Sequence, residues 1–187
     1  VDTDQLIPAR FMSRPRSAGY GGFLFHDLRR TPDGAPVDGF PLDDQRHAGA
    51  RILVARRNFG TGSSREAAVY ALVDYGIRCV VAPSFGDIFA SNAVKNGLLP
   101  AAVSEADAEA LLATVAAAPG LPVMVDLEAL AIRAGDLTVP FAIDPVRRLQ
   151  LLNGWDDIDL TLRHAGEIAA FAARRRAEAP WTVPAGA

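Results

Sequence analysis

The chain has 187 residues, of which 50% are apolar and 22% are charged, and its formal net charge is -3. This length is enough for one sizeable core, so we expect a single domain over residues 1–187. The slightly acidic balance gives no reason to propose nucleic acid or a membrane surface as a partner. No apolar segment approaches the ~20 residues that a membrane span requires.

The single cysteine and the three histidines limit the metal chemistry of the chain. Cys79 lies in the apolar run 77–82, which predicts a buried strand and an inert core thiol. One cysteine excludes an intrachain disulfide, is typical of a reducing compartment and cannot supply the thiolates of an iron–sulfur cluster. His26, His47 and His164 have no ligand spacing, so we expect no metal site in this chain.

The first residues carry Asp2 and Asp4 and lack an apolar region, so we expect no signal peptide. Because the sequence begins without Met, we expect its N-terminus to be missing or processed. Together with the cysteine count, this favours a cytoplasmic protein.

Turn-forming residues gather in residues 30–49, which we interpret as an irregular surface loop. From residue 50 onwards, apolar strand patterns alternate with helical patterns, which predicts an α/β domain. The expected strands are residues 52–55, 78–82 and 98–103, and the expected helices are residues 64–75, 86–96 and 104–118.

The last third of the chain predicts a hairpin followed by helices. Two extended runs, 122–133 and 137–143, flank the turn-forming residues 134–136. Asp144 is expected to cap a short helix through Leu152. We expect a final helix over residues 165–178, with Ile168, Phe171 and Ala172 facing inward, and a loose tail over residues 180–187.

The most informative segment is Asn-Phe-Gly-Thr-Gly-Ser-Ser-Arg-Glu, residues 58–66, called the serine loop below. Its two glycines allow a sharp turn between a strand and a helix. Ser63 and Glu66 have the spacing of a capping box, so the helix is expected to begin at Ser63 or Ser64. Free N–H groups at the helix start, with the guanidinium of Arg65, then predict an anion site.

The local pattern of the serine loop leaves a second interpretation open, because a capping box stabilises a helix without any function. The loop lacks the lysine of a phosphate loop, and Arg65 stands where the dinucleotide fingerprint needs Gly or Ala. An anion bound here is therefore expected to be a carboxylate rather than a nucleotide.

Several motifs in order along nearly the whole chain resemble the small subunit of 3-isopropylmalate dehydratase, which is similar to the swivelling C-terminal domain of aconitase. They are the opening Val-Asp-Thr-Asp-Gln-Leu-Ile-Pro, the serine loop, and residues 74–76, 82–89, 153–154 and 157–162. The resemblance implies an aconitase-type swivelling α/β domain with mixed sheets and helices in β/β/α layers.

The resemblance also implies a two-chain hydro-lyase that interconverts 2-isopropylmalate and 3-isopropylmalate by dehydration and rehydration in leucine biosynthesis. A large subunit would carry a four-iron four-sulfur cluster, and this chain would bind no cofactor itself. Ser63 would be the base that moves the substrate proton. The residues expected to contact substrate are Ser64, Arg65, Asp4 and Thr3, and those expected to support the loop are Gly60, Thr61, Gly62 and Glu66.

Two positions depart from the family pattern, since Ala67 stands where a histidine is common and Thr61 where many members have cysteine. The substrate is therefore left open, with dimethylmalate or methylmalate as alternatives, as is a non-catalytic anion-binding module. Residues 10–20 correspond to the region that sets side-chain specificity in the family, and whether Arg14, Arg16 or neither meets substrate there is left open. Asp2, Thr3 and Asp4 are expected either to line the site or to hold the serine loop.

Overall fold

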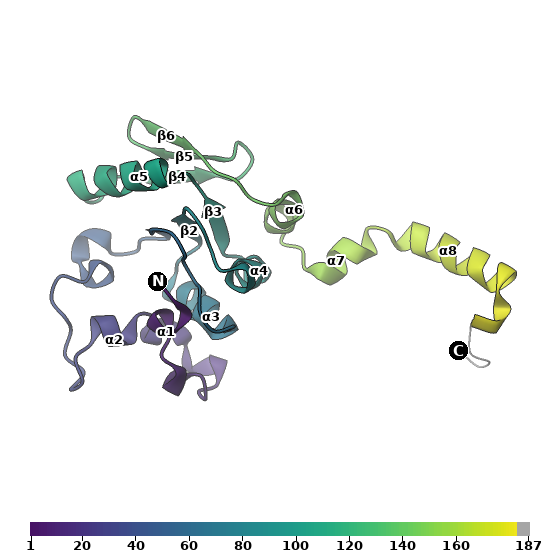
Figure 1. The fold of residues 1–187 in the computed structure, drawn as a ribbon, viewed down its shortest axis with the longest axis horizontal. Coiled ribbons are helices and arrows are strands. Elements are labelled where there is room, and N and C mark those ends of the chain that lie inside the picture. The colour runs from purple at the N-terminus through teal and green to yellow at the C-terminus, as the bar shows by residue number, and fades with distance from the viewer. Residues whose placement is uncertain (183–187) are drawn as a thin grey trace.

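Two three-stranded sheets form the centre of the computed structural model, which describes residues 1–182 (Figure 1). One sheet is parallel, with the order β1 (Ile52–Val54), β2 (Cys79–Ala82) and β3 (Leu99–Ala102). The other is antiparallel and consists of β4 (Val123–Asp126), β5 (Ala131–Ala134) and β6 (Leu137–Pro140). The predicted α/β class with mixed sheets is confirmed.

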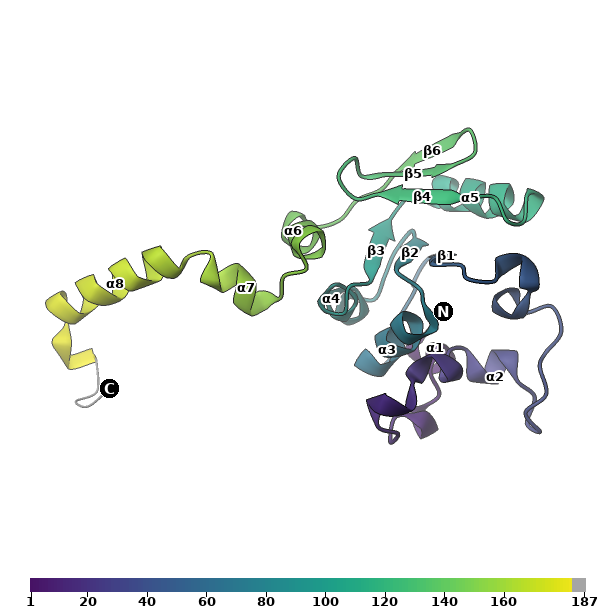
Figure 2. The same ribbon diagram turned by 180° about the vertical axis from the view of Figure 1, so that it is seen from behind.

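Helices cover the parallel sheet on one face, and the antiparallel sheet covers the other face together with a helix (Figures 1 and 2). The first face carries α3 (Glu66–Tyr75) and α4 (Asp87–Lys95), and the second carries α5 (Glu105–Ala117). The other helices are α1 (Thr3–Leu6), α2 (His26–Arg29), α6 (Pro145–Asn153), α7 (Asp157–Leu162) and α8 (Ala165–Glu178).

The central strand β2 is buried on both faces and separates two hydrophobic clusters. Its side chains alternate, because successive residues of a strand point to opposite faces. Val80 and Ala82 join the cluster under α3 and α4, whereas Cys79 and Val81 join the cluster under α5. Burial raises the pKa of the Cys79 thiol to about 12, as expected for a core thiol.

Two of the predicted helix starts are confirmed, because their caps depend only on neighbouring residues. The Ser104 side chain accepts the N–H of Asp107 at 3.0 Å before α5. The Asp144 carboxylate accepts two N–H groups at the start of α6, at 2.9 and 3.0 Å. Both contacts satisfy N–H groups that have no partner within the helix.

The predicted start of α3 is wrong. The helix begins at Glu66, its N-cap is Arg65 in extended conformation, and no side chain caps it. The expected capping box between Ser63 and Glu66 does not form, since the Glu66 carboxylate accepts the side-chain amide of Asn96 at 3.0 Å instead. A tertiary contact therefore overrides the local capping pattern.

The expected extended run 122–133 is two antiparallel strands rather than one. A turn at residues 127–130 separates β4 from β5, and Leu130 adopts a left-handed φ of 53°. The Asp126 carboxylate accepts the N–H groups of Glu128 and Ala129 at 3.0 and 2.8 Å, which stabilises this turn. The hairpin predicted at residues 134–136 is confirmed, because Ala134 pairs with Leu137.

The last two helices leave the body of the molecule, so the inward face predicted for residues 165–178 is wrong (Figures 1 and 2). Ile168 is 48% exposed, Phe171 is 57% exposed, and no residue of α8 is buried within residues 1–182. Helical spacing identifies an apolar face but not what covers it. Residues 180–182 of the predicted tail form a 3-10 turn, and residues 183–187 lie outside the described residues.

The predicted surface loop 30–49 contains two 3-10 turns, Pro41–Asp43 and Gln45–His47, and is anchored from beneath. The buried Arg29 side chain donates to both carboxylate oxygens of Asp43, at 2.5 and 3.0 Å. The Tyr75 hydroxyl donates to the carbonyl of Leu42 at 2.8 Å. The Arg29 guanidinium holds the pKa of Asp43 below its usual range.

Replacing Asp43 with Asn leaves the buried Arg29 guanidinium without its charged partner, so we expect the free energy of unfolding to fall by about 2–3 kcal/mol at neutral pH. Because the pKa of Asp43 is lower in the folded chain, its stabilising contribution is present above the ordinary carboxyl pKa of about 4 and is lost below it. Urea unfolding followed between pH 7 and pH 3 measures both effects.

The control for this prediction is Asp44→Asn, since the partner of Asp44 is Arg46, whose side chain is two-thirds exposed. An exposed pair contributes less than about 1 kcal/mol. Equal losses in the two variants would contradict a special role for the Arg29–Asp43 pair.

The turn after β1 requires a glycine at position 60 for two reasons. Gly60 has a left-handed φ of 72°. A Cβ placed on it would lie 2.3 Å from Cγ of Phe89, a buried side chain of α4. The turn therefore packs directly on the helix that follows β2.

Gly60→Ala should lower the free energy of unfolding by about 2–4 kcal/mol, because both the backbone and the Phe89 ring must move. Gly22→Ala is the matched control, since a Cβ there meets no heavy atom within 4 Å. Thermal unfolding of the two variants measures the difference. Equal melting temperatures would show that the turn does not need this close packing.

Candidate functional site

Three segments meet at the carboxyl edge of the parallel sheet, where ligands commonly bind in open α/β folds. Residues 58–62 follow β1, residues 84–86 follow β2, and residues 1–4 run beside them. Isolated parallel bridges join Phe59 to Phe85 and Asp2 to Thr61. The serine loop is therefore held between the start of the chain and the start of α4.

The backbone of residues 1–3 forms two hydrogen bonds with the serine loop, one at Gly60 and one at Thr61. The N–H of Gly60 donates to the carbonyl of Val1 at 2.8 Å, and the N–H of Thr3 donates to the carbonyl of Thr61 at 2.8 Å. Gly62 has a φ of 100° and lies against Asp2 and Thr3. These contacts fix the path of the loop before it reaches the serines.

Thr3 adds a side-chain contact beneath the loop. It is 2% exposed, and its hydroxyl donates to the carbonyl of Ser63 at 2.8 Å. Because the buried Thr3 hydroxyl would otherwise have no hydrogen-bond partner, this contact favours one conformation of the serine loop. Of the two roles expected for Thr3, holding the loop is the one that this geometry supports.

The segment after β2 supports the loop from the other side, a role that sequence patterns alone did not predict. The N–H of Asn58 donates to the Ser84 hydroxyl at 2.8 Å, and this hydroxyl donates to the Asn58 side chain at 3.1 Å. A Cβ on Gly86 would lie 2.5 Å from the carbonyl oxygen of Gly60. The signal that identifies these residues is Ser84-Phe85-Gly86, at the end of a buried strand.

Ser63 and Ser64 are both exposed, so their hydroxyls lie on the surface of the chain. Because α3 begins at Glu66, its free N–H groups and positive dipole end lie beyond the serines rather than at Ser63. The cationic group expected to act on an anion at Ser63 is therefore Arg65. The hydroxyl of Thr61 donates to the carbonyl of Asn58 at 3.1 Å, within the turn.

Arg65 and Asp4 form an ion pair between Nη1 and Oδ1. The Arg65 side chain is 14% exposed and that of Asp4 is 55% exposed, so the arginine is held and the carboxylate lies near solvent. A substrate carboxylate can replace such an exposed partner at low cost, because surface ion pairs contribute little. The guanidinium also keeps N–H groups that this pair does not use.

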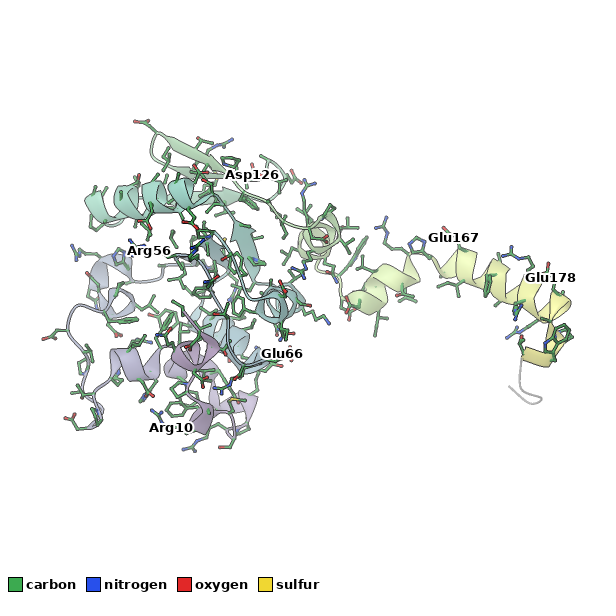
Figure 3. All side chains as sticks on the ribbon, viewed as in Figure 1. Arg10, Arg56, Glu66, Asp126, Glu167 and Glu178 are labelled. Carbon is green, nitrogen blue, oxygen red and sulfur yellow. The ribbon has the colours of Figure 1, made fainter. Side chains whose placement is uncertain are left out.

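Glu66 is exposed and contacts the neighbouring helix, whereas Ala67 is directed toward the core. Glu66, labelled in Figure 3, links α3 to α4 through Asn96. Ala67 is half-buried and packs against the cluster beneath α3. The position at which the family commonly has histidine therefore lies between the loop and the core.

Arg16 and Arg14 have different surroundings. The Arg16 guanidinium donates to Asp74 at 3.1 Å and lies 3.6 Å from the ring centroid of Tyr70, so it fastens its segment to α3. The Arg14 side chain is exposed, and its carbonyl accepts the hydroxyl of Tyr20 at 2.8 Å. Of the two, Arg14 is the one whose guanidinium is not used to fasten this segment.

The serine loop stands beside a hollow of about 290 Å³, but its serines do not line it. The hollow lies at the carboxyl ends of β2 and β3 and includes Phe85, Asp87, Asp144 and Arg147. In the chain alone, the exposed Ser63 and the largely buried Arg65 side chain therefore lie outside this hollow.

Within residues 1–182, no three histidine, cysteine, aspartate or glutamate side chains gather as ligands for one metal ion. In the same part of the chain, each helix is too short or too polar to cross a bilayer.

Three family models match separate parts of the sequence, and the one described as LeuD_N matches residues 109–145. The model described as the aconitase C-terminal domain matches residues 1–106, which include both the serine loop and the segments that hold it. The model described as the C-terminal domain of the 3-isopropylmalate dehydratase small subunit matches residues 157–185.

Relatives along nearly the whole chain carry the same name. The chain is 49% identical over 184 residues to the 3-isopropylmalate dehydratase small subunit of Rhodospirillum centenum, covering 98% of this chain and 91% of that protein. It is 50% identical over 182 residues to the small subunit of Acidothermus cellulolyticus, covering 97% and 89%. A crystal structure of 3-isopropylmalate dehydratase from Methanocaldococcus jannaschii matches with a TM-score of 0.64 and 27% identity, covering 91% and 92%. The chain therefore belongs to the family of 3-isopropylmalate dehydratase small subunits and has the fold of the aconitase C-terminal domain.

Proposed function

We propose that this chain is the small subunit of a 3-isopropylmalate dehydratase and that Ser63 is the base that moves the substrate proton. The observation that carries the proposal is an exposed Ser63 whose carbonyl is held by the buried Thr3, two residues before Arg65, whose guanidinium is paired with Asp4. The names of its relatives favour isopropylmalate over dimethylmalate or methylmalate as the substrate. They also favour a catalytic subunit over an anion-binding module.

The partner in this proposal is a large subunit that carries a four-iron four-sulfur cluster. This chain does not fit a cluster of its own, because Cys79 is its one cysteine and is buried in the core. Such a cluster would supply Lewis-acid binding of the substrate hydroxyl. A cytoplasmic location is part of the same proposal, and the reduced Cys79 thiol supports it.

The chemistry assigned to Ser63 is a proton transfer at carbon. As an alkoxide, Ser63 takes the proton from the carbon next to a substrate carboxylate. The electron pair of that C–H bond forms the alkene as the hydroxyl group leaves the neighbouring carbon. In rehydration Ser63 returns this proton to the carbon that lost the hydroxyl group, and hydroxide adds at the carbon that lost the proton, which gives the isomer and restores the alkoxide.

Arg65 makes this transfer feasible, because an ordinary serine hydroxyl is a poor base at neutral pH. A fixed cation close to the oxygen stabilises the alkoxide, provided that water is excluded. Arg65 also binds a substrate carboxylate in place of Asp4, and the exposed Ser64 hydroxyl donates to the same anion.

The open position of the serine loop explains why the small subunit needs a partner. Ser63 is exposed in the chain alone, where bulk water would screen Arg65 and protonate an alkoxide. A second surface that covers the loop removes this water and brings the substrate to the serine. We therefore expect no turnover by this chain alone.

Ser63→Ala should lower kcat by about 10³-fold in the reconstituted two-subunit enzyme, because it removes the proton-transfer group and leaves the Ser63 carbonyl contact intact. Ser64→Ala is the control and should cost about 10-fold or less, the value of one hydrogen bond to a charged group. Anaerobic turnover of 2-isopropylmalate measures both. Normal kcat in Ser63→Ala would exclude this serine as the base. If the wild-type enzyme converted dimethylmalate or methylmalate faster than 2-isopropylmalate, the proposed substrate would be wrong.

Arg65→Lys should raise KM for the diacid about 10-fold or more, because lysine keeps the charge but not the planar, two-pronged guanidinium. Asp4→Asn is the matched variant, since it removes the competing carboxylate while Arg65 stays in place. We expect KM in Asp4→Asn to stay within a factor of about three of wild type or to fall. An unchanged KM in Arg65→Lys would show that Arg65 does not bind the substrate carboxylate.

A further inference from the structure

The C-terminal arm, residues 155–182, exposes large apolar side chains along its length. On α7, Ile158 is 67% exposed and Leu162 is 61% exposed. Phe171 on α8 is 57% exposed, and Trp181 beyond it is 80% exposed. A row of this kind is uncommon on a soluble monomer and marks a surface that another molecule covers.

The arm begins at a fixed point on the body. The Asp157 carboxylate accepts the side-chain amide of Gln150 at 2.9 Å and pairs with Lys95 of α4 at 3.2 Å. Asp156 and Asp159 form a capping box that starts α7. Beyond these contacts the arm projects away from both sheets, and Figure 3 shows its side chains, Glu167 and Glu178 among them, standing clear of the body. Its 14-residue helix α8 alone reaches roughly 20 Å.

The far end of the arm is basic. Arg174, Arg175 and Arg176 are consecutive and exposed, and Arg174 lies over the Phe171 ring at 5.6 Å. Within residues 1–182 no carboxylate forms an ion pair with these three arginines. Aromatic anchors next to arginines are typical of the energetically important part of a protein interface. An arm of this character is complementary to an apolar groove with an acidic rim.

A second copy of this chain is the alternative occupant for the arm. A facing arm would offer the acidic side chains of α7, which already have partners, and Glu167 and Glu178 of α8. Asp157 is held by Lys95 and Gln150, and Asp156 and Asp159 cap the helix. Glu167 faces His164 at 3.4 Å. Because Glu167 is 83% exposed, two arms can pair it with these arginines, so the self-association measurement distinguishes a second copy from the large subunit.

The family matches separate the arm from the shared domain. The model of the aconitase C-terminal domain ends at residue 106, whereas the models described as LeuD_N and as the C-terminal domain of the dehydratase small subunit match residues 109–145 and 157–185. Residues 109–145 pack into the body, whereas the arm lies in the last of these matches. A domain that is the C-terminal part of a longer chain keeps its partner by covalent linkage, whereas a separate subunit must bind it. The arm is the part of this chain that is suited to replace such a link.

We propose that the C-terminal arm docks in an acidic-rimmed apolar groove of the large subunit and is the main anchor of the two-subunit enzyme. This inference rests on the proposed function, because it names the surface by which the chain holds the partner implied there. The serine loop closes the substrate site, and the arm holds the subunits together.

The experiment uses the full chain with Ile168→Asp and Phe171→Asp combined, since both positions are exposed and the change should not affect folding. The matched control is Met124→Asp on β4, which is 54% exposed and lies on the body. Calorimetric titration against the purified large subunit gives Kd, and sedimentation equilibrium gives the self-association of this chain. We expect Kd to rise about 10-fold or more in the arm variant and to stay unchanged in the control.

A second pair tests the charge of the groove. Arg175→Glu should weaken binding about 10-fold or more at low salt and less at high salt, whereas Arg133→Glu on β5 should not. Turnover of every variant at saturating large subunit should equal wild type, which separates the arm from Ser63. If the wild-type chain binds the large subunit and turns over substrate, an unchanged Kd in both arm variants overturns this inference. The proposed function of the chain would then still stand. Loss of self-association without loss of large-subunit affinity assigns the arm to a second copy and also overturns this inference.

Discussion

The site depends on the way in which residues 1–4 hold the serine loop. Val1 and Thr3 pair with the backbone of Gly60 and Thr61, and the buried Thr3 hydroxyl takes the carbonyl of Ser63. The contacts join the start of the chain to a turn some sixty residues later. As a result, the backbone carbonyl of Ser63 is fixed by Thr3, while the residue itself remains exposed to solvent.

The layered fold supplies the platform for this arrangement. The strand β2 is buried between two clusters, so the carboxyl edge of the parallel sheet is rigid. Gly60 packs against Phe89, and Gly86 packs against the carbonyl of Gly60, which brings α4 directly under the turn. The body therefore holds the serine loop in a defined conformation and supplies one side of the proposed active site. The exposed serines on this body and the exposed arm beyond it both point to a partner that completes the enzyme.

Sequence analysis predicted the features that depend on neighbouring residues. The caps Ser104 and Asp144 satisfy N–H groups two or three residues away, and both formed as expected. The capping box at Ser63 has the same local spacing but did not form, because the helix begins only at Glu66 and the Glu66 carboxylate binds Asn96 instead. The pattern at Ile168 and Phe171 identified an apolar face, but no sequence spacing tells whether that face meets the body or another chain.

The family motifs located the serine loop, and the structure adds how the loop is held. Ser84 and Gly86 belong to a recognised motif, yet their contact with the turn exists only after β1 and β2 pair. Likewise, Arg14 and Arg16 are two residues apart and equivalent in type. Only the fold separates them, because Asp74 and Tyr70 of α3 lie beside Arg16.

Amide hydrogen exchange of the chain without its partner tests most directly whether the first residues hold the serine loop. The N–H groups of Gly60 and Thr3 are bonded to Val1 and Thr61, so their exchange should be slow in the wild-type chain. Exchange of both groups should become faster in Thr3→Val, which removes the hydroxyl bound to Ser63, while β2 stays protected. Fast exchange of Gly60 and Thr3 in the wild-type chain would contradict the account, because the loop would then be unordered before its partner arrives.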